Sequence, residues 1–230
     1  MSNLLSKQVI KFNESLHYEG QLPNRFQVLN PFRDNPETMV VMRKFYESFY
    51  SDNNPRSFII GINPSRHGAG VTGVPFTDTK RLNQVCGIEM KSAHTHEVSS
   101  VFLYDVIAAY GGAASFYSRF YVNSPFPLAI VRQNEPNGKW LNANYYDDDS
   151  LFQMVKDYMI WSLQTQVNFG LETKKAFVLG KKNFDFIKRL NQEAKLFKEL
   201  VVLEHPRYIQ QYRSKKRDEY IEKYLNAFDN

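Results

Sequence analysis

The 230-residue sequence contains a single cysteine, Cys86. One thiol cannot close an intramolecular disulfide, and it excludes a four-cysteine iron–sulfur cluster and a structural zinc site built on thiolates. The sequence also lacks an apolar run of membrane-spanning length, and charges are scattered where a signal peptide would have its apolar core. We therefore expect an intracellular, cytoplasmic protein with no membrane partner, no metal ion and no cofactor.

Internal repeats, low-complexity tracts and Ser/Gly-rich linkers are absent as well. We therefore expect one domain over residues 1–230, with residues 1–25 as a leading arm or helix. Lys and Arg number 29 against 24 Asp and Glu, and the net charge of +5 favours anionic partners without identifying one. Aromatic residues make up 15% of the chain, which is enough to supply stacking surfaces as well as a core.

Short apolar runs alternate along the chain with segments of helical periodicity. Helices are expected at 37–52, 79–90, from Ser99 or Ser100 to 110, 150–168, 182–195 and the basic C-terminal end, and strands at 58–60, 119–123, 176–180 and 199–206. The polar residues 133–149 are expected to form a loop. This order predicts the α/β class, with a three-layer α/β/α sandwich around a central, mostly parallel four-stranded sheet.

The most informative stretch runs from residue 56 to residue 78. The strand expected at 58–60 ends in Gly61-Ile62-Asn63-Pro64, because Pro64 cannot donate to a continuing strand ladder. A glycine-bearing loop and Pro75-Phe76 follow. At the carboxyl edge of a parallel sheet, this pattern is typical of a pocket floor that the backbone approaches closely. Ordinary alternatives exist, with Asn63 as a turn cap and Phe76 as a core aromatic.

Polar side chains follow three of the predicted strands. They are Asn63, Asn123 and His205. Because parallel strands end at the same edge of a sheet, we expect these three side chains to meet at one crevice. The alternatives are a turn residue for Asn123 and a structural role for His205.

The string GINPSRHGAGVTGVPF, residues 61–76, closely resembles the first motif of the single-strand-selective monofunctional uracil-DNA glycosylases. This family belongs to the uracil-DNA glycosylase superfamily. THEVSSVF is similar to the family's Glu-Val-Ser helix start, and YVNSPFPL resembles its Val-His-Asn-x-Cys-Pro-Leu string. His205-Pro206 resembles the start of its second motif, and a weaker similarity around Leu29-Asn30-Pro31 extends the coverage to most of the chain.

Three departures from the family pattern mark a divergent branch. Ser65 stands where the family usually has glycine at the pocket wall, which bears on base specificity. Ser124-Pro125 differs from the usual pair beside the base-reading Asn. The His-Pro motif continues as Arg207-Tyr208-Ile209-Gln210, so the loop expected to wedge into DNA is changed.

The resemblance implies a monofunctional DNA glycosylase of base excision repair. Such an enzyme flips uracil out of DNA and hydrolyses its N-glycosidic bond, leaving an abasic site, and other deaminated or oxidised bases are further candidate substrates. The resemblance assigns catalysis to two residues: His205 would donate to O2 of the departing base, and Asn63 would hold the attacking water. An amide cannot act as a general base as a carboxylate does, so water placement and leaving-group stabilisation should dominate.

The resemblance also assigns residues that bind the base. Phe76 would stack on it and Asn123 would read its Watson–Crick edge, with Gly61, Ile62 and Ser65 lining the pocket. The amide of Asn123 offers one donor and one acceptor, which match O4 and N3–H of uracil and mismatch cytosine. No lysine matches a Schiff-base position, so the DNA strand should stay uncut.

Contacts to DNA are expected from the basic residues after the His-Pro motif. They are Arg207, Arg213, Lys215, Lys216 and Arg217, with Tyr208 or Ile209 as a candidate wedge between bases. The alternative is a solvated helix face. The partner is single- or double-stranded DNA with uracil or related damage, and we expect the protein to be a monomer.

Other functions remain open from the sequence. One is a non-catalytic protein that holds single-stranded nucleic acid on the same fold, with Phe76 as a stacking ring. Another is a small-molecule hydrolase that uses Ser65, although the Gly-x-Ser-x-Gly elbow is absent. His94 and His96 resemble a metal pair, but a surface role is expected because no third ligand lies nearby in the sequence.

Overall fold

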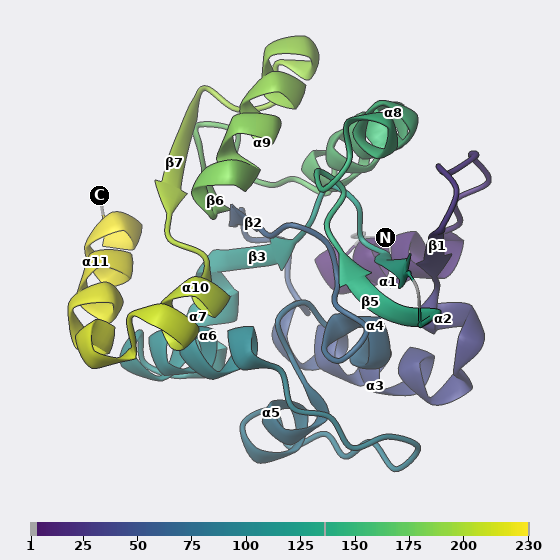
Figure 1. Cartoon of the computed structure of the whole chain (residues 1–230). Coiled ribbons are helices and arrows are strands. Elements are labelled where there is room, and N and C mark those ends of the chain that lie inside the picture. The colour runs from purple at the N-terminus through teal and green to yellow at the C-terminus, as the bar shows by residue number, and fades with distance from the viewer. Residues whose placement is uncertain (1–3, 136, 230) are drawn as a thin grey trace.

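The computed structural model describes residues 4–135 and 137–229 (Figure 1). Its central sheet consists of four parallel strands in the order β3-β2-β6-β7. These strands are β2 (Ser57–Ile60), β3 (Phe120–Asn123), β6 (Lys175–Leu179) and β7 (Glu199–Leu203). Helices lie on both faces of this sheet (Figure 1), which confirms the predicted three-layer α/β/α architecture.

Aromatic side chains join the helices to both faces of the sheet. On one face the rings of Phe120 and Phe177 pack against Phe228 of α11 (Arg217–Asp229), at centroid distances of 4.4 and 5.0 Å. On the other face the hydroxyl of Tyr121 donates to Gln166 of α8 (Asp149–Val167) at 3.1 Å. Successive strand residues point to opposite faces, so β3 connects both helical layers.

The remaining helices surround this core. They are α1 (Leu5–Ser15), α2 (Pro31–Asp34), α3 (Pro36–Phe49), α4 (Ala69–Thr72), α5 (Thr79–Gln84), α6 (Val98–Ala109), α7 (Ala113–Arg119), α9 (Lys181–Ala194), α10 (Pro206–Tyr212) and the 3-10 turn η1 (Ser214–Lys216). The leading helix α1 packs against α3, and its first N–H groups donate to the backbone carbonyls of Asp52 and Tyr50 at 3.0 and 2.9 Å.

The prediction of a loop at 133–149 is wrong. The strands β4 (Ala129–Asn134) and β5 (Lys139–Ala143) form a hairpin, and β1 (Phe26–Leu29) pairs with β4 to complete an antiparallel sheet. The last pair of the hairpin is Asn134 with Lys139, and Gly138, just before β5, adopts a φ of +66°, which glycine tolerates because it has no Cβ. The polar composition of 133–149 concealed β5 because most of this strand is exposed.

Several predicted helix boundaries also shift. Helix α6 has Glu97 as its N-cap residue in place of Ser99 or Ser100, and α5 ends at Gln84 in place of residue 90. Helix α7 was not predicted; it begins directly after Gly112. Strand β7 ends at Leu203, and α10 starts at Pro206, which suits the first helical position because proline has no N–H to leave unpaired there.

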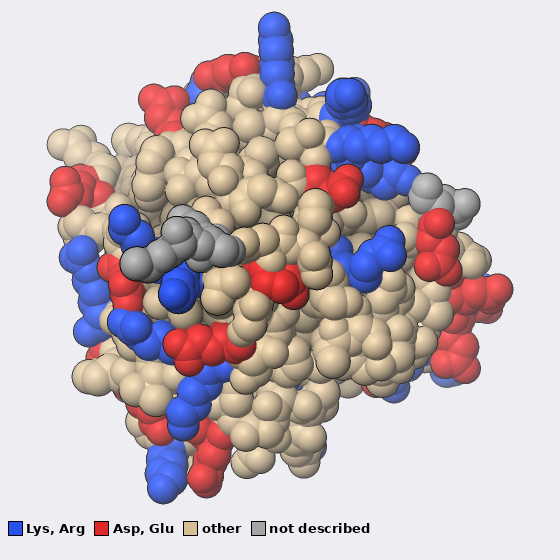
Figure 2. Space-filling model, turned by 180° about the vertical axis from the view of Figure 1, so that it is seen from behind, with Lys and Arg blue, Asp and Glu red and all other residues tan. Residues whose placement is uncertain are grey.

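The face seen from behind intermingles acidic and basic side chains (Figure 2). No charge of one sign dominates the described part of that face. Among the described residues no single helix is long and apolar enough to cross a membrane. Only when the two helices α6 and α7, which are joined by a sharp bend, are taken together do they reach the length and apolar composition of a span.

Candidate active site

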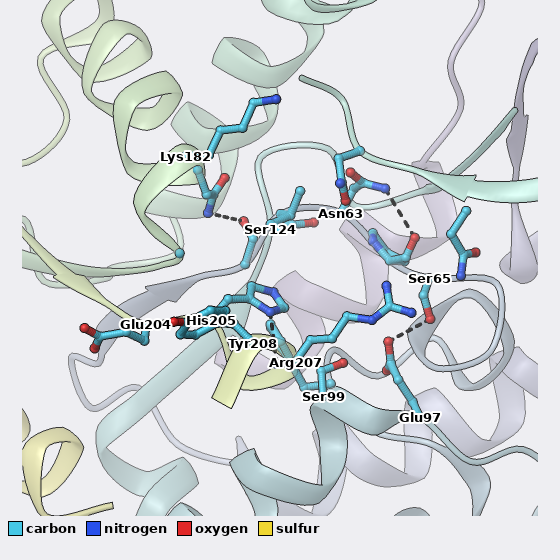
Figure 3. Close-up of a pocket in the computed structure, with 18 of the residues that line it drawn as sticks. Asn63, Ser65, Glu97, Ser99, Ser124, Lys182, Glu204, His205, Arg207 and Tyr208 are labelled. Carbon is cyan, nitrogen blue, oxygen red and sulfur yellow. Dashed lines mark hydrogen bonds between the residues drawn. The ribbon is translucent and has the colours of Figure 1, made fainter. Parts of the chain in front are cut away.

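A cavity of about 650 Å³ opens where strands β2, β3 and β7 end (Figure 3). The structure brings most of the predicted site residues to its wall: Gly61, Ile62, Asn63, Ser65, Phe76, Asn123, His205, Arg207, Tyr208 and Arg213. Figure 3 shows His205 on one side of the cavity and Ser65 with Glu97 on the other. The rim position of these residues follows from the parallel sheet, whose strand ends share one edge.

The side chain of Asn63 is fixed by the segment after β5. Its Nδ2 donates to the carbonyl of Ala143 at 3.0 Å, and its Oδ1 accepts from the backbone N–H of Tyr145 at 3.1 Å. These bonds set the orientation of the amide. Because a carbonyl oxygen has two lone pairs, Oδ1 keeps one acceptor position for a further donor such as water.

Phe76 presents its ring to the cavity from an unusual backbone conformation. Its φ is +53°, in the left-handed region that residues other than glycine rarely adopt. The ring lies against Gly61, where an added Cβ would come within 2.8 Å of a ring carbon. The ring centroid is 5.8 Å from that of His205. Gly61 is therefore the residue that lets Phe76 lie over the end of β2.

Asn123 is buried, with 4% of its surface exposed. Its Nδ2 donates to the hydroxyl of Tyr121 at 2.8 Å, and its Oδ1 accepts from the backbone N–H of Ser124 at 2.9 Å. Each end of the amide keeps one further hydrogen-bonding position. The side chain can therefore pair with a donor and an acceptor that lie side by side.

His205 caps helix α10 and has a defined tautomer. Its Nδ1 accepts from the backbone N–H of Arg207 at 3.1 Å, so the proton of the neutral ring stands on Nε2. Burial lowers the pKa of His205 to about 4, and the nearby charge of Arg207 acts in the same direction. His205 is therefore a neutral donor near pH 7.

Glu97 is a cavity residue that the sequence analysis did not assign. Its Oε1 accepts from the hydroxyl of Ser65 at 2.7 Å, and burial raises the pKa of its carboxyl group. The Glu97 carboxyl group also lies against the backbone of Gly68, where an added Cβ would be 1.8 Å from Oε2, so this position requires glycine. The Glu-Val-Ser string was the sequence signal that could have identified Glu97 as a site residue, but it was used only to predict the start of a helix.

Basic side chains lie on two sides of the cavity. Arg207 and Arg213 of the α10 segment line it, as do Lys181 and Lys182, which the sequence analysis missed. The sequence signal for these two lysines was their position directly after Gly180, at the start of a helix. The first backbone N–H groups of a helix also have no partner within the helix. The predicted Lys215, Lys216 and Arg217 are not among the lining residues. Arg217 instead pairs with Asp105, and Lys216 lies 3.1 Å from Glu219.

Helix α10 carries an exposed aromatic pair at the cavity rim. The rings of Tyr208 and Tyr212 lie 5.7 Å apart, and the Arg213 guanidinium lies 5.5 Å from the Tyr208 ring centroid. Tyr212 has 67% of its surface exposed. A helix therefore stands where the sequence analysis expected a changed loop.

Within residues 4–135 and 137–229, no three side chains of His, Cys, Asp or Glu gather as metal ligands. His96, one of the two loop histidines, instead contacts Arg81 through Nδ1 at 2.7 Å.

Comparisons with known proteins agree with this geometry. No curated protein matches the chain. Among solved structures, SMUG2 from Pedobacter heparinus is 43% identical, with a TM-score of 0.96 over 100% of this chain and 98% of that one. The family model of the uracil-DNA glycosylase superfamily matches residues 47–229. The chain therefore belongs to the uracil-DNA glycosylase superfamily as a SMUG-type member, a DNA glycosylase that hydrolyses N-glycosyl bonds.

Proposed function

We propose that this glycosylase flips uracil out of DNA into the cavity at the strand ends and hydrolyses its bond to deoxyribose, leaving an abasic site. The observation that carries this proposal is the fixed tautomer of His205, which aims a neutral Nε2–H donor at the cavity lined by Phe76 and Asn123. Other deaminated or oxidised bases are further candidates.

Base recognition would use Phe76 and Asn123. The Phe76 ring offers a flat face on which a planar base stacks. The open donor and acceptor positions of Asn123 match O4 and N3–H of uracil, whereas cytosine presents N4–H₂ and an unprotonated N3 and so mismatches both. This pairing explains why the amide is held rigidly by Tyr121 and Ser124.

Bond cleavage would rest on His205 and Asn63. Breaking the N-glycosidic bond leaves negative charge on the base, and the Nε2–H of His205 would donate to O2 as that charge develops. Loss of one such donor typically raises the barrier by roughly 3 to 4 kcal/mol. Asn63 would place the water that attacks the sugar carbon, using the open lone pair of its Oδ1.

The reaction is proposed to stop at the abasic site. Cutting the strand would require a lysine that forms a Schiff base with the sugar. Lys182, which lines the cavity, has its Nζ 4.8 Å from the centroid of the Tyr146 ring, in a cation–π contact. Trapping with borohydride tests this step directly.

DNA would lie across the cavity mouth, with phosphates near Lys181 and Lys182 on one side and Arg207 and Arg213 on the other. The exposed Tyr208 and Tyr212 rings offer stacking surfaces to bases beside the flipped nucleotide. Unpaired bases stack most readily on such surfaces, so we propose activity on single-stranded DNA, with double-stranded DNA as the comparison substrate.

The test uses purified protein and an oligonucleotide that carries one uracil, in single- and double-stranded form. Cleavage that requires hot alkali after incubation, with no adduct trapped by borohydride, is the expected result. An intact strand after alkali, at enzyme excess and in both forms, would overturn the assignment of uracil. Strand cutting without alkali, together with a borohydride adduct, would overturn the proposed single-step chemistry.

A further inference from the structure

The left-handed backbone at Phe76 needs support from its neighbours. A residue with a side chain pays a conformational penalty at a φ of +53°, and such residues persist only where the surrounding structure holds them. Phe76 lies in the segment between α4 and α5, outside any helix or strand. The contacts of the residues next to it therefore decide where its ring lies.

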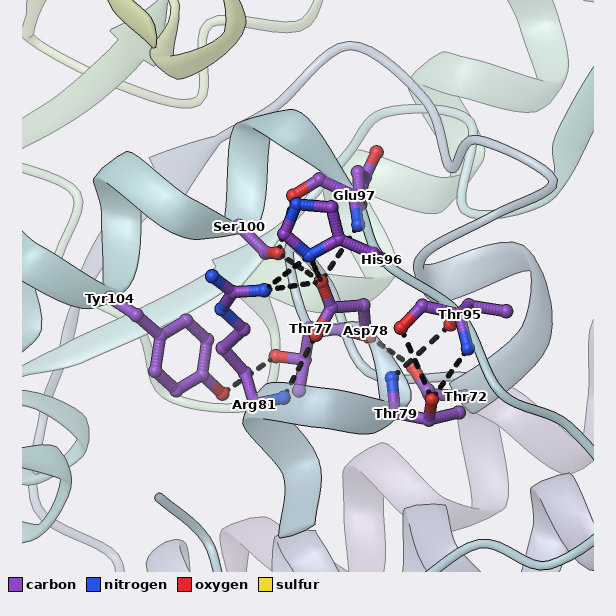
Figure 4. A network of polar contacts seen from close by, with 10 residues as sticks. All are labelled: Thr72, Thr77, Asp78, Thr79, Arg81, Thr95, His96, Glu97, Ser100 and Tyr104. Atoms are coloured by element: carbon purple, nitrogen blue, oxygen red, sulfur yellow. Dashed lines mark hydrogen bonds and ion pairs between the residues drawn. The ribbon is translucent and has the colours of Figure 1, made fainter. Parts of the chain in front are cut away.

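Asp78, two residues after Phe76, is fully buried and accepts four hydrogen bonds (Figure 4). Its Oδ1 accepts from the backbone N–H of Arg81 at 2.8 Å, and its Oδ2 from the Arg81 guanidinium at 3.1 Å. Oδ2 also accepts from the backbone N–H of Glu97 and the hydroxyl of Ser100, both at 2.7 Å. Burial alone would raise the pKa of Asp78, but these bonds outweigh it and hold the pKa below its usual value.

Threonine hydroxyls hold the backbone on either side of the Phe76 ring. Thr77 donates through Oγ1 to the carbonyl of Pro75 at 3.0 Å, and Thr72 donates to the carbonyl of Thr77 at 2.6 Å. Thr72 and Thr77 are both fully buried. The Pro75–Asp78 segment is therefore fixed at Pro75, Thr77 and Asp78, on both sides of the ring-bearing residue.

Asp78 also reaches the opposite wall of the cavity. Asp78 accepts a hydrogen bond from the backbone N–H of Glu97, and the side-chain carboxylate of Glu97 accepts one from the Ser65 hydroxyl at 2.7 Å. One buried carboxylate thus connects the segment that carries Phe76 with the start of α6 and, through Glu97, with the loop that follows Asn63. Arg81 is its ion-pair partner at 3.1 Å, and His96 lies 3.6 Å away at the surface.

We propose that Asp78 is a positioning residue of the glycosylase: it fixes the Phe76 ring, and with it the flipped base, at the distance from His205 that bond cleavage requires. This inference rests on the proposed function. Asp78 is buried behind the cavity wall and touches no substrate, so it acts through Phe76. A misplaced ring would leave DNA binding intact and slow the chemical step, because orientation matters most at the reacting atoms.

The test is a double-mutant cycle that combines Asp78→Asn with Phe76→Ala, read as single-turnover release of uracil. Asp78→Asn should slow release about 10- to 100-fold, the range expected for a misplacement of about 1 Å. In the Phe76→Ala background the same change should slow release by no more than about twofold, because the ring that Asp78 positions is gone. Binding to DNA that carries an abasic-site analogue should be unchanged in all variants.

Asp52→Asn is the matched control. Asp52 is partly exposed and pairs with the fully buried Arg56 at 2.8 Å, so this change also removes a carboxylate that pairs with a buried arginine, but it lies away from the cavity wall. It should lower the melting temperature with little effect on the single-turnover rate. Equal rate losses for Asp78→Asn and Asp52→Asn at matched stability would overturn the positioning role.

Further outcomes separate this inference from the proposed function. Full additivity of Asp78→Asn and Phe76→Ala would show that Asp78 acts elsewhere and would overturn the inference alone. A wild-type protein that releases no uracil would overturn the proposed function first. If Asp78→Asn does not fold, Thr72→Val takes its place. This change removes the bond to the Thr77 carbonyl at 2.6 Å and the bond that Thr72 accepts from the Val74 N–H at 3.2 Å. Its effect on release should likewise disappear in the Phe76→Ala background.

Discussion

The Nδ1 atom of His205 accepts a hydrogen bond from the backbone N–H of Arg207 at 3.1 Å. This one contact excludes a proton from Nδ1 and leaves Nε2–H as the donor that faces the cavity. It also explains why a protonated ring is disfavoured, since imidazolium has no acceptor to offer Arg207.

The low pKa of His205 predicts a specific dependence of stability on pH. The ring titrates near 4 in the folded protein and near 6.5 when unfolded. The unfolded chain therefore binds a proton first as the pH falls, so stability is lost between pH 6.5 and 4, by on the order of 3 kcal/mol. His205→Asn should flatten this part of the profile of unfolding free energy against pH. An unchanged slope in the variant would contradict the burial of a neutral ring.

Glu97 should affect stability in the opposite pH direction. Its folded pKa is raised by burial, so ionisation in the folded state costs stability as the pH rises above 4.5. Glu97→Gln should therefore unfold at the same denaturant concentration as wild type near pH 4 and at a higher one near pH 8. Glu37 provides a contrast, because backbone bonds from Lys91 and Ser92 lower its pKa. Glu37→Gln should lose stability near neutral pH, and a loss of stability near pH 8 in Glu97→Gln would contradict the account.

Gly61→Ala should disturb the stacking ring. Its Cβ would lie 2.8 Å from the ring of Phe76, a contact that must be relieved by movement. Overpacking of this kind typically costs about 1 to 3 kcal/mol, and the displaced ring should slow uracil release as well. In the Phe76→Ala background the closest remaining neighbour of the added methyl group is the Asn123 carbonyl at 3.5 Å, an ordinary contact, so both losses should disappear. Thermal melts and single-turnover assays of the four proteins measure this, and losses that persist without the ring would refute the contact.

The lysines at the start of α9 should contact phosphates. Replacing both Lys181 and Lys182 by alanine should weaken binding to single-stranded DNA at low salt. It should also reduce the slope of log K against log salt by about 1.4, or about 0.7 for each phosphate that the protein no longer neutralises. Lys215 and Lys216 lie outside the cavity lining and provide a double alanine control of equal charge. Equal changes of slope in both variants would assign the effect to net charge alone.

The sequence predicted the parallel sheet and the rim residues because both follow from local patterns. Asn63 follows the end of β2, Asn123 ends β3 and His205 follows β7, so the topology of a parallel sheet brings them together. The resemblance added roles that spacing alone left open, such as stacking for Phe76.

Pairings between distant segments were less accessible. Strand β1 pairs with β4, about 100 residues later, and β5 is too exposed to show an apolar pattern, so the antiparallel sheet was missed. The bond between Ser65 and Glu97 and the support of Phe76 by Asp78 likewise connect loops whose spacing carries no signal. Lys181 and Lys182 were predictable in principle, because a helix that follows a parallel strand starts at the same rim as the site.

The central claim is that the cavity releases uracil by the combined action of His205 and Asn63. Mass spectrometric detection of free uracil from a single-stranded oligonucleotide, under single turnover, tests it most directly. The wild-type protein should release uracil, and His205→Ala should lose about 10²- to 10³-fold in rate, with a comparable loss for Asn63→Ala. Both variants should bind abasic-site DNA as wild type does. Full activity in both folded variants would contradict the assigned roles, and no free uracil from the wild-type protein would contradict the account as a whole.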